Sequence, residues 1–234
     1  MAAVSAEEGH LDGGKKSLIQ CSWLHSFMNE QDVERISEAV RQAEKTTSGE
    51  IVPMVVRRSS SVGHVPLILG LLLLMGALFL DFNWLAQEST FLRSLSWLLE
   101  LLIIFLLIRF LAPLHFIQRW LSDRDDLARQ VEMRAELEFY EHGLQKTTGA
   151  TGILIFVSLM ERRAVILADS SISSKLPPDI WDKFLHELTE SIHQKQFAQG
   201  MLNIIGKMGE LITAQFPRSE HDHDELPNEL IVKD

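Results

Sequence analysis

The residue best placed for chemistry in this 234-residue sequence is Asp169. It follows the apolar run Ala164 to Ala168, which predicts a buried strand, and serines stand at 170, 171 and 173. Because α/β folds place ligands beyond the carboxyl ends of strands, Asp169 is a candidate ligand-contacting carboxylate. The alternative is ordinary turn chemistry, in which the side chain accepts hydrogen bonds from the next backbone amides.

A second group of possible ligands is the run His-Asp-His-Asp-Glu at residues 221–225. Imidazole and carboxylate groups bind metals, so His221 and His223 are metal candidates. The run lies after Pro217 in an acidic segment, residues 218–234, which we expect to be a solvated tail without fixed geometry. Within it, Glu225 to Leu230 mixes apolar and acidic residues, a pattern that suits docking on the domain or on a partner.

Composition excludes several function classes. The net charge of −10 argues against a nucleic-acid partner, which would require a basic face. The single cysteine excludes a disulfide scaffold. The sequence contains no phosphate loop, no His-Glu-x-x-His, no Gly-x-Ser-x-Gly and no dinucleotide fingerprint.

The apolar residues are concentrated in residues 64–114, where only Asp81, Glu88, Arg93, Glu100 and Arg109 are charged. A membrane-spanning helix needs about 20 mostly apolar residues. The segment therefore predicts a transmembrane α-hairpin, with spans at about 62–82 and 94–114. The alternative is a hairpin buried inside a soluble domain. A carboxylate within a span is functional by default, although Glu100 also lies near the loop end, where it could snorkel.

Positive charge flanks the hairpin on its outer sides. Arg57 and Arg58 precede the first span, Arg119 and Arg124 follow the second, and the loop holds only Arg93. By the positive-inside rule both soluble ends are cytoplasmic. We expect an integral protein of a bacterial inner (plasma) membrane, with the lipid bilayer and a membrane protein as its partners.

The soluble parts alternate helices and strands, which favours a small layered α/β domain that the inserted hairpin splits. We expect a mobile N-terminal tail at 1–28, a first part of the domain at 29–58 and a second at 115–217. Asn29 and Asp32 resemble a capping box. The expected elements before the hairpin are a helix at 30–46 and a strand at 50–56, in which Pro53 favours an edge position or a bulge. After it we expect a helix at 122–143, an antiparallel hairpin of strands at 152–159 and 164–168, and two final helices between 177 and 217.

Several of these motifs resemble the TPM domain family. Thr47-Ser48-Gly49-Glu50-Ile51-Val52 is similar to the opening strand of that family, and Gly152 to Ser158 with Ala164 to Asp169 is similar to its central hairpin. Trp181, Gly200 and Phe216-Pro217 resemble its helical C-terminal part. Ala150 and Thr151 stand where the family often has a basic residue and Asn, and Ser170 stands where it often has Gly.

The resemblance implies a membrane-associated or lumenal α/β domain, of a kind linked to photosystem repair and receptor modulation. It favours an interaction or assembly and maintenance module for a membrane protein complex. Some members are proposed to be acid phosphatases or calcium binders. On that alternative the protein is a metal-assisted phosphomonoester hydrolase in which Asp169 is a metal ligand or nucleophile, Glu50 is a second carboxylate, and Ca²⁺ or Mg²⁺ is the cofactor.

Overall fold

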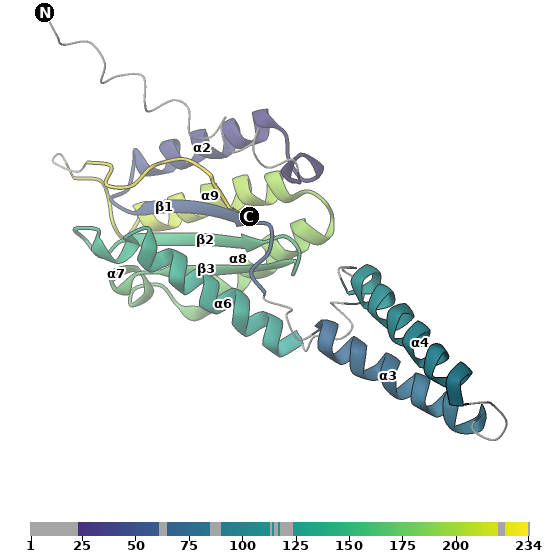
Figure 1. Cartoon of the computed structure of the whole chain (residues 1–234). Helices are drawn as coiled ribbons and strands as arrows, with labels where there is room; N and C mark the ends of the chain where they lie inside the picture. The colour runs from purple at the N-terminus through teal and green to yellow at the C-terminus, as the bar shows by residue number, and fades with distance from the viewer. Residues whose placement is uncertain are drawn as a thin grey trace, which may run out of the picture. The chain divides into compact units, whose positions relative to one another are not determined.

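The structure, a computed structural model, describes residues 23–60, 65–84, 90–112, 114, 117, 124–219 and 223–233 (Figure 1). The chain divides into two compact units. The α/β unit consists of residues 1–59 and 128–234, and the hairpin unit consists of residues 60–127. The unit that follows residue 59 in sequence therefore interrupts the α/β unit, whose two parts fold together.

A four-stranded mixed sheet forms the centre of the α/β unit (Figure 1). Its strands are β1 (Glu50–Val56), β2 (Gly152–Ser158), β3 (Arg163–Ala168) and β4 (Ile231–Lys233), in the order β3-β2-β1-β4. Strand β1 is parallel to both β2 and β4, whereas β2 and β3 form the expected antiparallel hairpin.

Helices cover both faces of this sheet. One face packs against α2 (Glu30–Glu44), α8 (Pro178–His193) and α9 (Phe197–Thr213), and the other packs against α6 (Arg124–Glu141). Every residue of β1 and β2 is buried, as expected for strands with helices on both sides. The unit is thus the layered α/β fold that alternating elements predict.

Local sequence explains where the helices begin and end. The capping box of α2 is present, with the Asn29 side chain accepting from the Asp32 N–H and the Asp32 side chain accepting from the Asn29 N–H. Pro178 occupies the first turn of α8. After α6, Gly143 takes a φ of 72°, which a side chain would disfavour. The short elements are η1 (Leu24–Ser26), η2 (Leu144–Lys146) and α7 (Ser170–Ser173).

Two expectations about the chain ends need correction. The N-terminal tail does not extend to residue 28, because Leu24 and Met28 are buried in the core beside α2; residues 1–22 lie outside the described residues. The C-terminal residues 218–234 are not a solvated tail throughout, because Leu230 is buried and Ile231–Lys233 forms β4. An open strand edge offers N–H and C=O groups that such an apolar run can pair with.

Strand β1 lies inside the sheet although it contains Pro53. Strand β4 pairs only with Met54, Val55 and Val56, so the half of β1 that contains Pro53 is paired on one side, with β2. Proline lacks a ladder donor and is tolerated at such positions. The expected edge character of Pro53 is therefore local to that half of the strand.

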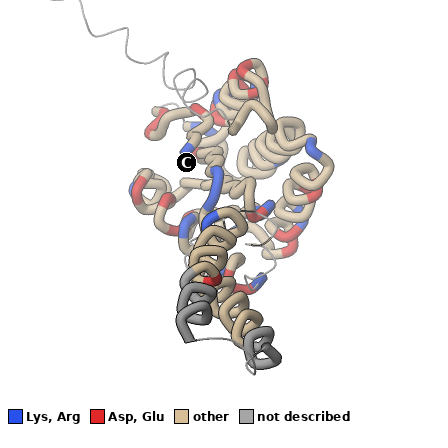
Figure 2. The backbone as a smooth tube through the Cα atoms, turned by 45° about the vertical axis from the view of Figure 1, so that its right-hand side comes forward, with Lys and Arg blue, Asp and Glu red and all other residues tan. Residues whose placement is uncertain are grey.

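The hairpin unit consists of α3 (Val65–Trp84) and α4 (Thr90–Leu111), near the expected spans at 62–82 and 94–114. The helices pack closely, since a Cβ on Gly70 would lie 3.1 Å from Ile108 Cδ1. Most described residues of the two helices are uncharged (tan in Figure 2). Many of their large apolar side chains are exposed, including Leu67 and Phe110. Counting only described residues, no helix combines the length and apolar character needed to cross a membrane.

Candidate functional site

The two candidate carboxylates from the sequence lie at one end of the sheet. Glu50 begins β1 and pairs with Gly152, and the Asp169 N–H donates to the Gly152 carbonyl at 2.9 Å. Because β3 is antiparallel to β2, its carboxyl end meets the amino ends of β1 and β2. Asp169 therefore lies at the amino ends of the parallel strands β1 and β2, whereas α/β folds usually hold ligands at the carboxyl ends.

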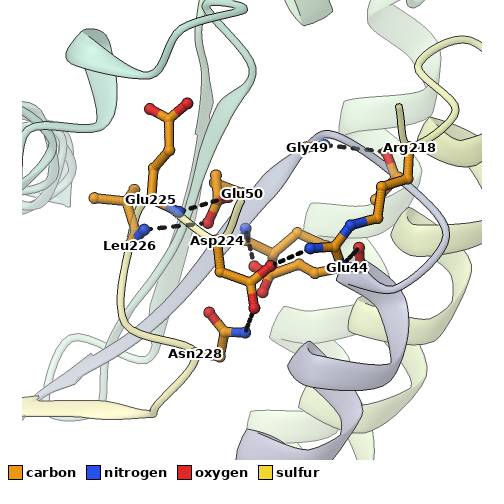
Figure 3. A network of polar contacts seen from close by, with 10 residues as sticks. Glu44, Gly49, Glu50, Arg218, Asp224, Glu225, Leu226 and Asn228 are labelled. Atoms are coloured by element: carbon orange, nitrogen blue, oxygen red, sulfur yellow. Dashed lines mark hydrogen bonds and ion pairs between the residues drawn. The ribbon is translucent and has the colours of Figure 1, made fainter. Parts of the chain in front are cut away.

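Glu50 fastens the C-terminal segment to the sheet (Figure 3). Its Oε1 accepts from the Glu225 N–H at 3.1 Å, and its Oε2 accepts from the Leu226 N–H at 3.4 Å. The residue is only 6% exposed, and burial raises the pKa of its carboxyl. The two amides oppose this rise in pKa, whereas the neighbouring carboxylates of Asp224 and Glu225 add to it.

Glu44, the last residue of α2, is a second buried carboxyl in the same cluster. Its Oε1 accepts from the Ile51 N–H at 2.8 Å, whereas its Oε2 is buried without a hydrogen-bond partner. Burial raises the pKa of Glu44 to about 8, with the Ile51 N–H opposing the rise and the Glu50 carboxylate adding to it. Glu44 is therefore mostly protonated at neutral pH, which removes the cost of burying its charge.

Arg218 links this cluster to the end of α2 (Figure 3). Its Nη2 lies 2.8 Å from Asp224 Oδ1, and its Nη1 donates to the main-chain carbonyl of Glu44 at 3.0 Å. Asp224 also accepts from Asn228 Nδ2 at 3.3 Å. Arg218, Asp224 and Asn228 thus tie the described residues on both sides of 220–222 to one another and to the end of α2.

A third buried carboxylate, Glu138 of α6, anchors β4 from the other face of the sheet. Glu138 is fully buried and pairs with Lys233 of β4, while Arg134 Nη2 lies 2.7 Å from its Oε1. His142 Nε2 lies 3.4 Å from its Oε2. Strand β4 is therefore held by ion pairing at its last residue, and Glu50 holds residues 225 and 226 a few positions before the strand begins.

Asp169 has the turn-capping arrangement. It is the N-cap of α7, and its Oδ1 accepts from the Ser170 N–H at 2.5 Å. Its Oδ2 is buried without a hydrogen-bond partner. The cap uses one carboxylate oxygen. The other, Oδ2, is a buried polar atom without a hydrogen-bond donor, which the cap does not explain.

The candidate metal ligands are not brought into a common site in the described part of the chain. There, no three His, Cys, Asp or Glu side chains are arranged to hold a metal ion. His223 is exposed, and His221 lies outside the described residues. Both oxygens of Glu50 face main-chain N–H donors, so its geometry suits fastening of the C-terminal segment.

Sequence reasoning missed Glu44 and Glu138, although a signal for each was present. Glu44 continues the apolar stripe of α2 through Val33, Ile36 and Val40, and a carboxylate in such a stripe is buried by its position. Glu138 lies seven residues after Val131 on the buried stripe of α6. An acidic residue within an apolar helical stripe therefore marks both anchors.

Comparison with known proteins agrees with this fold. Residues 118–211 match the TPM domain family. The described part of this range runs from α6 into α9. The chain is also similar in structure to the BA42 protein from the psychrophilic bacterium Bizionia argentinensis, solved by NMR, with a TM-score of 0.56. That similarity covers 91% of this chain and 99% of BA42 at 22% sequence identity, and it shows the fold. No curated protein matches the chain.

Proposed function

We propose that the protein is a membrane-anchored interaction module. In this proposal the hairpin of α3 and α4 inserts into the bilayer, and the TPM-like α/β unit binds a membrane protein complex and supports its assembly or maintenance. The single observation that carries the proposal is the exposure of large apolar side chains along both helices of the hairpin.

The exposed apolar surface is much larger than the hairpin can hide between its own helices. Leu67 is 76% exposed and Phe110 is 71% exposed. Further exposed residues of the pair are Ile68, Leu71, Leu72, Leu74, Met75, Leu78, Leu99, Leu101, Leu102, Ile103, Phe105, Leu106 and Leu107. Contiguous apolar patches of this kind mark membrane or protein contacts.

The full sequences of the two helices, as distinct from their described residues alone, favour the bilayer over a protein partner as the environment of the hairpin. Helices of 20 and 22 residues extend for about 30 Å at 1.5 Å per residue, similar to the hydrocarbon core. The sequence of α3 has no Lys, Arg, Asp or Glu before Asp81. The arginines at 57, 58, 119 and 124 flank the hairpin and outnumber Arg93, which lies in the first turn of α4 at the opposite end, so both soluble ends face the cytoplasm.

The α/β unit supports binding better than turnover. Its carboxylates at the sheet edge hold the chain's own backbone, as Glu50 holds Glu225 and Leu226. Residues 115–234 carry 13 Lys and Arg against 20 Asp and Glu, a net charge of −7. This charge disfavours adhesion to an anionic lipid surface and favours a protein partner with a basic cytoplasmic face.

Cross-linking in native membranes tests the proposal. A photo-reactive residue at exposed Asp182 of α8 should capture a discrete membrane protein, and the same substitution at the exposed Leu71 of the hairpin should capture lipid or membrane protein. Reporter fusions at Asp234 and within residues 85–89, between α3 and α4 in sequence, should report opposite sides of the membrane. Cytoplasmic signals from both fusions, or no discrete product from Asp182, would contradict the proposal.

The alternative function, metal-assisted phosphomonoester hydrolysis by Asp169 and Glu50, is favoured by one observation, the unpartnered Asp169 Oδ2. The test is turnover of phosphomonoesters by the full chain with Ca²⁺ or Mg²⁺. Turnover that Asp169→Ala abolishes, with thermal stability preserved, would establish the hydrolase. Absence of turnover together with absence of an ion-induced thermal shift would exclude it.

A further inference from the structure

Residues 223–226, the clasp, form a stretch without helix or strand beside the end of α2 and the start of β1 (Figure 3). The side chains at 223–225 are exposed, whereas Leu230, a few positions later, is buried. Exposed stretches without secondary structure are the parts of a protein that open locally, at a lower free energy than global unfolding. The polar contacts of the clasp therefore decide how firmly it is closed.

Four carboxyl groups and one guanidinium gather where the clasp meets the core (Figure 3). They belong to two core residues, Glu44 and Glu50, to two clasp residues, Asp224 and Glu225, and to Arg218. The guanidinium lies 2.8 Å from Asp224 Oδ1 and donates to the main-chain carbonyl of Glu44. With every carboxyl ionised, this group would hold an excess of negative charge. A protein lowers the cost of such an excess by keeping a buried carboxyl protonated.

Glu44 is the carboxyl whose position most strongly disfavours a charge. The residue is 3% exposed, its Oε1 accepts from the Ile51 N–H at 2.8 Å, and its Oε2 is buried without a hydrogen-bond partner. Burial raises the pKa of this carboxyl to about 8. The Ile51 N–H opposes the rise, the carboxylates of Glu50 and Asp224 add to it, and Arg218 opposes it. Glu44 therefore changes its charge close to neutral pH, with a clasp residue facing it.

We propose that the clasp is a pH-sensitive closure, which stays shut while Glu44 is neutral and opens when Glu44 ionises. Opening moves Asp224 and Glu225 away from the core carboxyls and admits water to Glu44, whose proton passes to the solvent. Repulsion and desolvation are both relieved in the open state. Rising pH therefore exposes the carboxyls of Glu44 and Glu50 at the amino end of β1. This device belongs to the α/β unit and does not depend on membrane insertion.

The remaining contacts of the clasp define what opening breaks. Glu50 accepts from the Glu225 and Leu226 N–H groups, and the Glu225 carboxylate accepts from the Thr148 N–H at 3.0 and 3.2 Å. Burial also raises the pKa of Glu50, and the Asp224 and Glu225 carboxylates add to this rise against the two amides, so Glu50 titrates in the same sense as Glu44. Strand β4 pairs with β1 separately, so the clasp can open while β4 stays in place.

Hydrogen exchange of the full chain in detergent at pH 6 and pH 8 tests the proposal. The reporters are the N–H groups of Glu225, Leu226 and Thr148, with rates corrected for the intrinsic pH dependence of amide exchange. Between the two pH values, the opening constant should rise at least about tenfold more in the unaltered chain than in Glu44→Gln, because ionisation of one group contributes up to tenfold per pH unit. The matched control is Glu34→Gln, at an exposed position on α2, which should respond like the unaltered chain.

Exchange in β2 separates local opening of the clasp from global unfolding. The clasp amides should exchange faster than those of β2 at both pH values. Equal exchange rates in the clasp and in β2, or the same pH response in the unaltered chain and Glu44→Gln, would overturn the proposal. If Glu44→Gln does not fold, Asp224→Asn serves instead, since it keeps an oxygen for Arg218 and removes a charge that faces Glu44. Asp224→Asn should weaken the pH response, and an unchanged response would overturn the proposal.

Discussion

The two units of this protein handle apolar and charged side chains in opposite ways. The α/β unit buries the apolar residues of β1 and β2 on both faces and gives its buried carboxylates hydrogen-bond donors, cations or a proton. The hairpin unit exposes apolar side chains such as Leu67 and Phe110 and holds few charges. The stability of the α/β unit should therefore depend on pH and on its charged side chains. Retention of the hairpin unit in a membrane should depend instead on its apolar side chains.

Within the α/β unit, two buried glutamates show different solutions to the cost of burying charge. At Glu138 the solution is pairing with cations, because Arg134 and Lys233 both contact its carboxyl oxygens. Glu44 has no cation on its carboxyl oxygens and is neutral over much of the pH range. Charge removal near Glu138 and proton loss from Glu44 are thus different ways to destabilise the same sheet.

The largest stability effect is expected when Glu138 loses its cations. The double variant Arg134→Met with Lys233→Met leaves a fully buried carboxylate with His142 as its remaining basic neighbour. An uncompensated buried charge costs about 3–5 kcal/mol, which urea denaturation would measure. The control is Lys183→Met, which removes an exposed pair with Asp179 and should cost below about 1 kcal/mol. Equal effects of the two variants would contradict the assigned role of Glu138.

A smaller effect is expected from Glu44→Gln, and it depends on pH. The folded protein holds the Glu44 proton up to about pH 8, whereas the unfolded chain releases it near pH 4.5. The contribution of this proton to stability is therefore complete below pH 4.5 and is lost as the pH rises toward 8, by about 1.4 kcal/mol per unit.

This pH dependence can be measured by urea denaturation at pH 6 and pH 8. The unaltered chain should lose about 2 kcal/mol more than Glu44→Gln between these two values. The remaining slope would include Glu50, whose pKa burial also raises. Parallel pH profiles for the two chains would show that Glu44 is ionised in the folded state.

A more local effect, of similar size, is expected from Glu50→Ala. The variant removes the acceptors of the Glu225 and Leu226 N–H groups and should cost about 1–3 kcal/mol. Hydrogen exchange at residues 224–233 should accelerate before exchange in β2, because the C-terminal segment loses one of its anchors. The exposed Glu136→Ala on α6 is the control. Unchanged exchange at 224–233 would refute the anchoring role.

Local signals in the sequence were sufficient to predict most of the α/β unit. The Asn29–Asp32 cap, the apolar stripe of α2 and the run Gly152 to Ser158 each correspond to an element whose ends lie within two residues of the expected ones. The β2–β3 hairpin followed from the short connection at 159–162. These features depend on neighbours in sequence, so the sequence displays them directly.

The features that depend on distant partners could not be predicted in this way. Strand β4 is three residues long, too short for a periodic pattern, and it is a strand because the edge of β1 pairs with it. The place of Asp169 at the amino edge of β1 and β2 depends on the antiparallel direction of β3. The pairing of Glu138 with Lys233 joins residues 95 positions apart.

Membrane retention of the full chain tests the central claim most directly. After alkaline carbonate extraction, the unaltered chain should remain with the membrane, whereas Leu71→Arg with Leu106→Arg should be released, since each arginine costs about 2.5–3.5 kcal/mol near the centre of a span. The matched control is Met133→Arg, at an exposed apolar position on α6, and it should stay with the membrane. Release of the unaltered chain, or equal retention of the double arginine variant, would contradict the account.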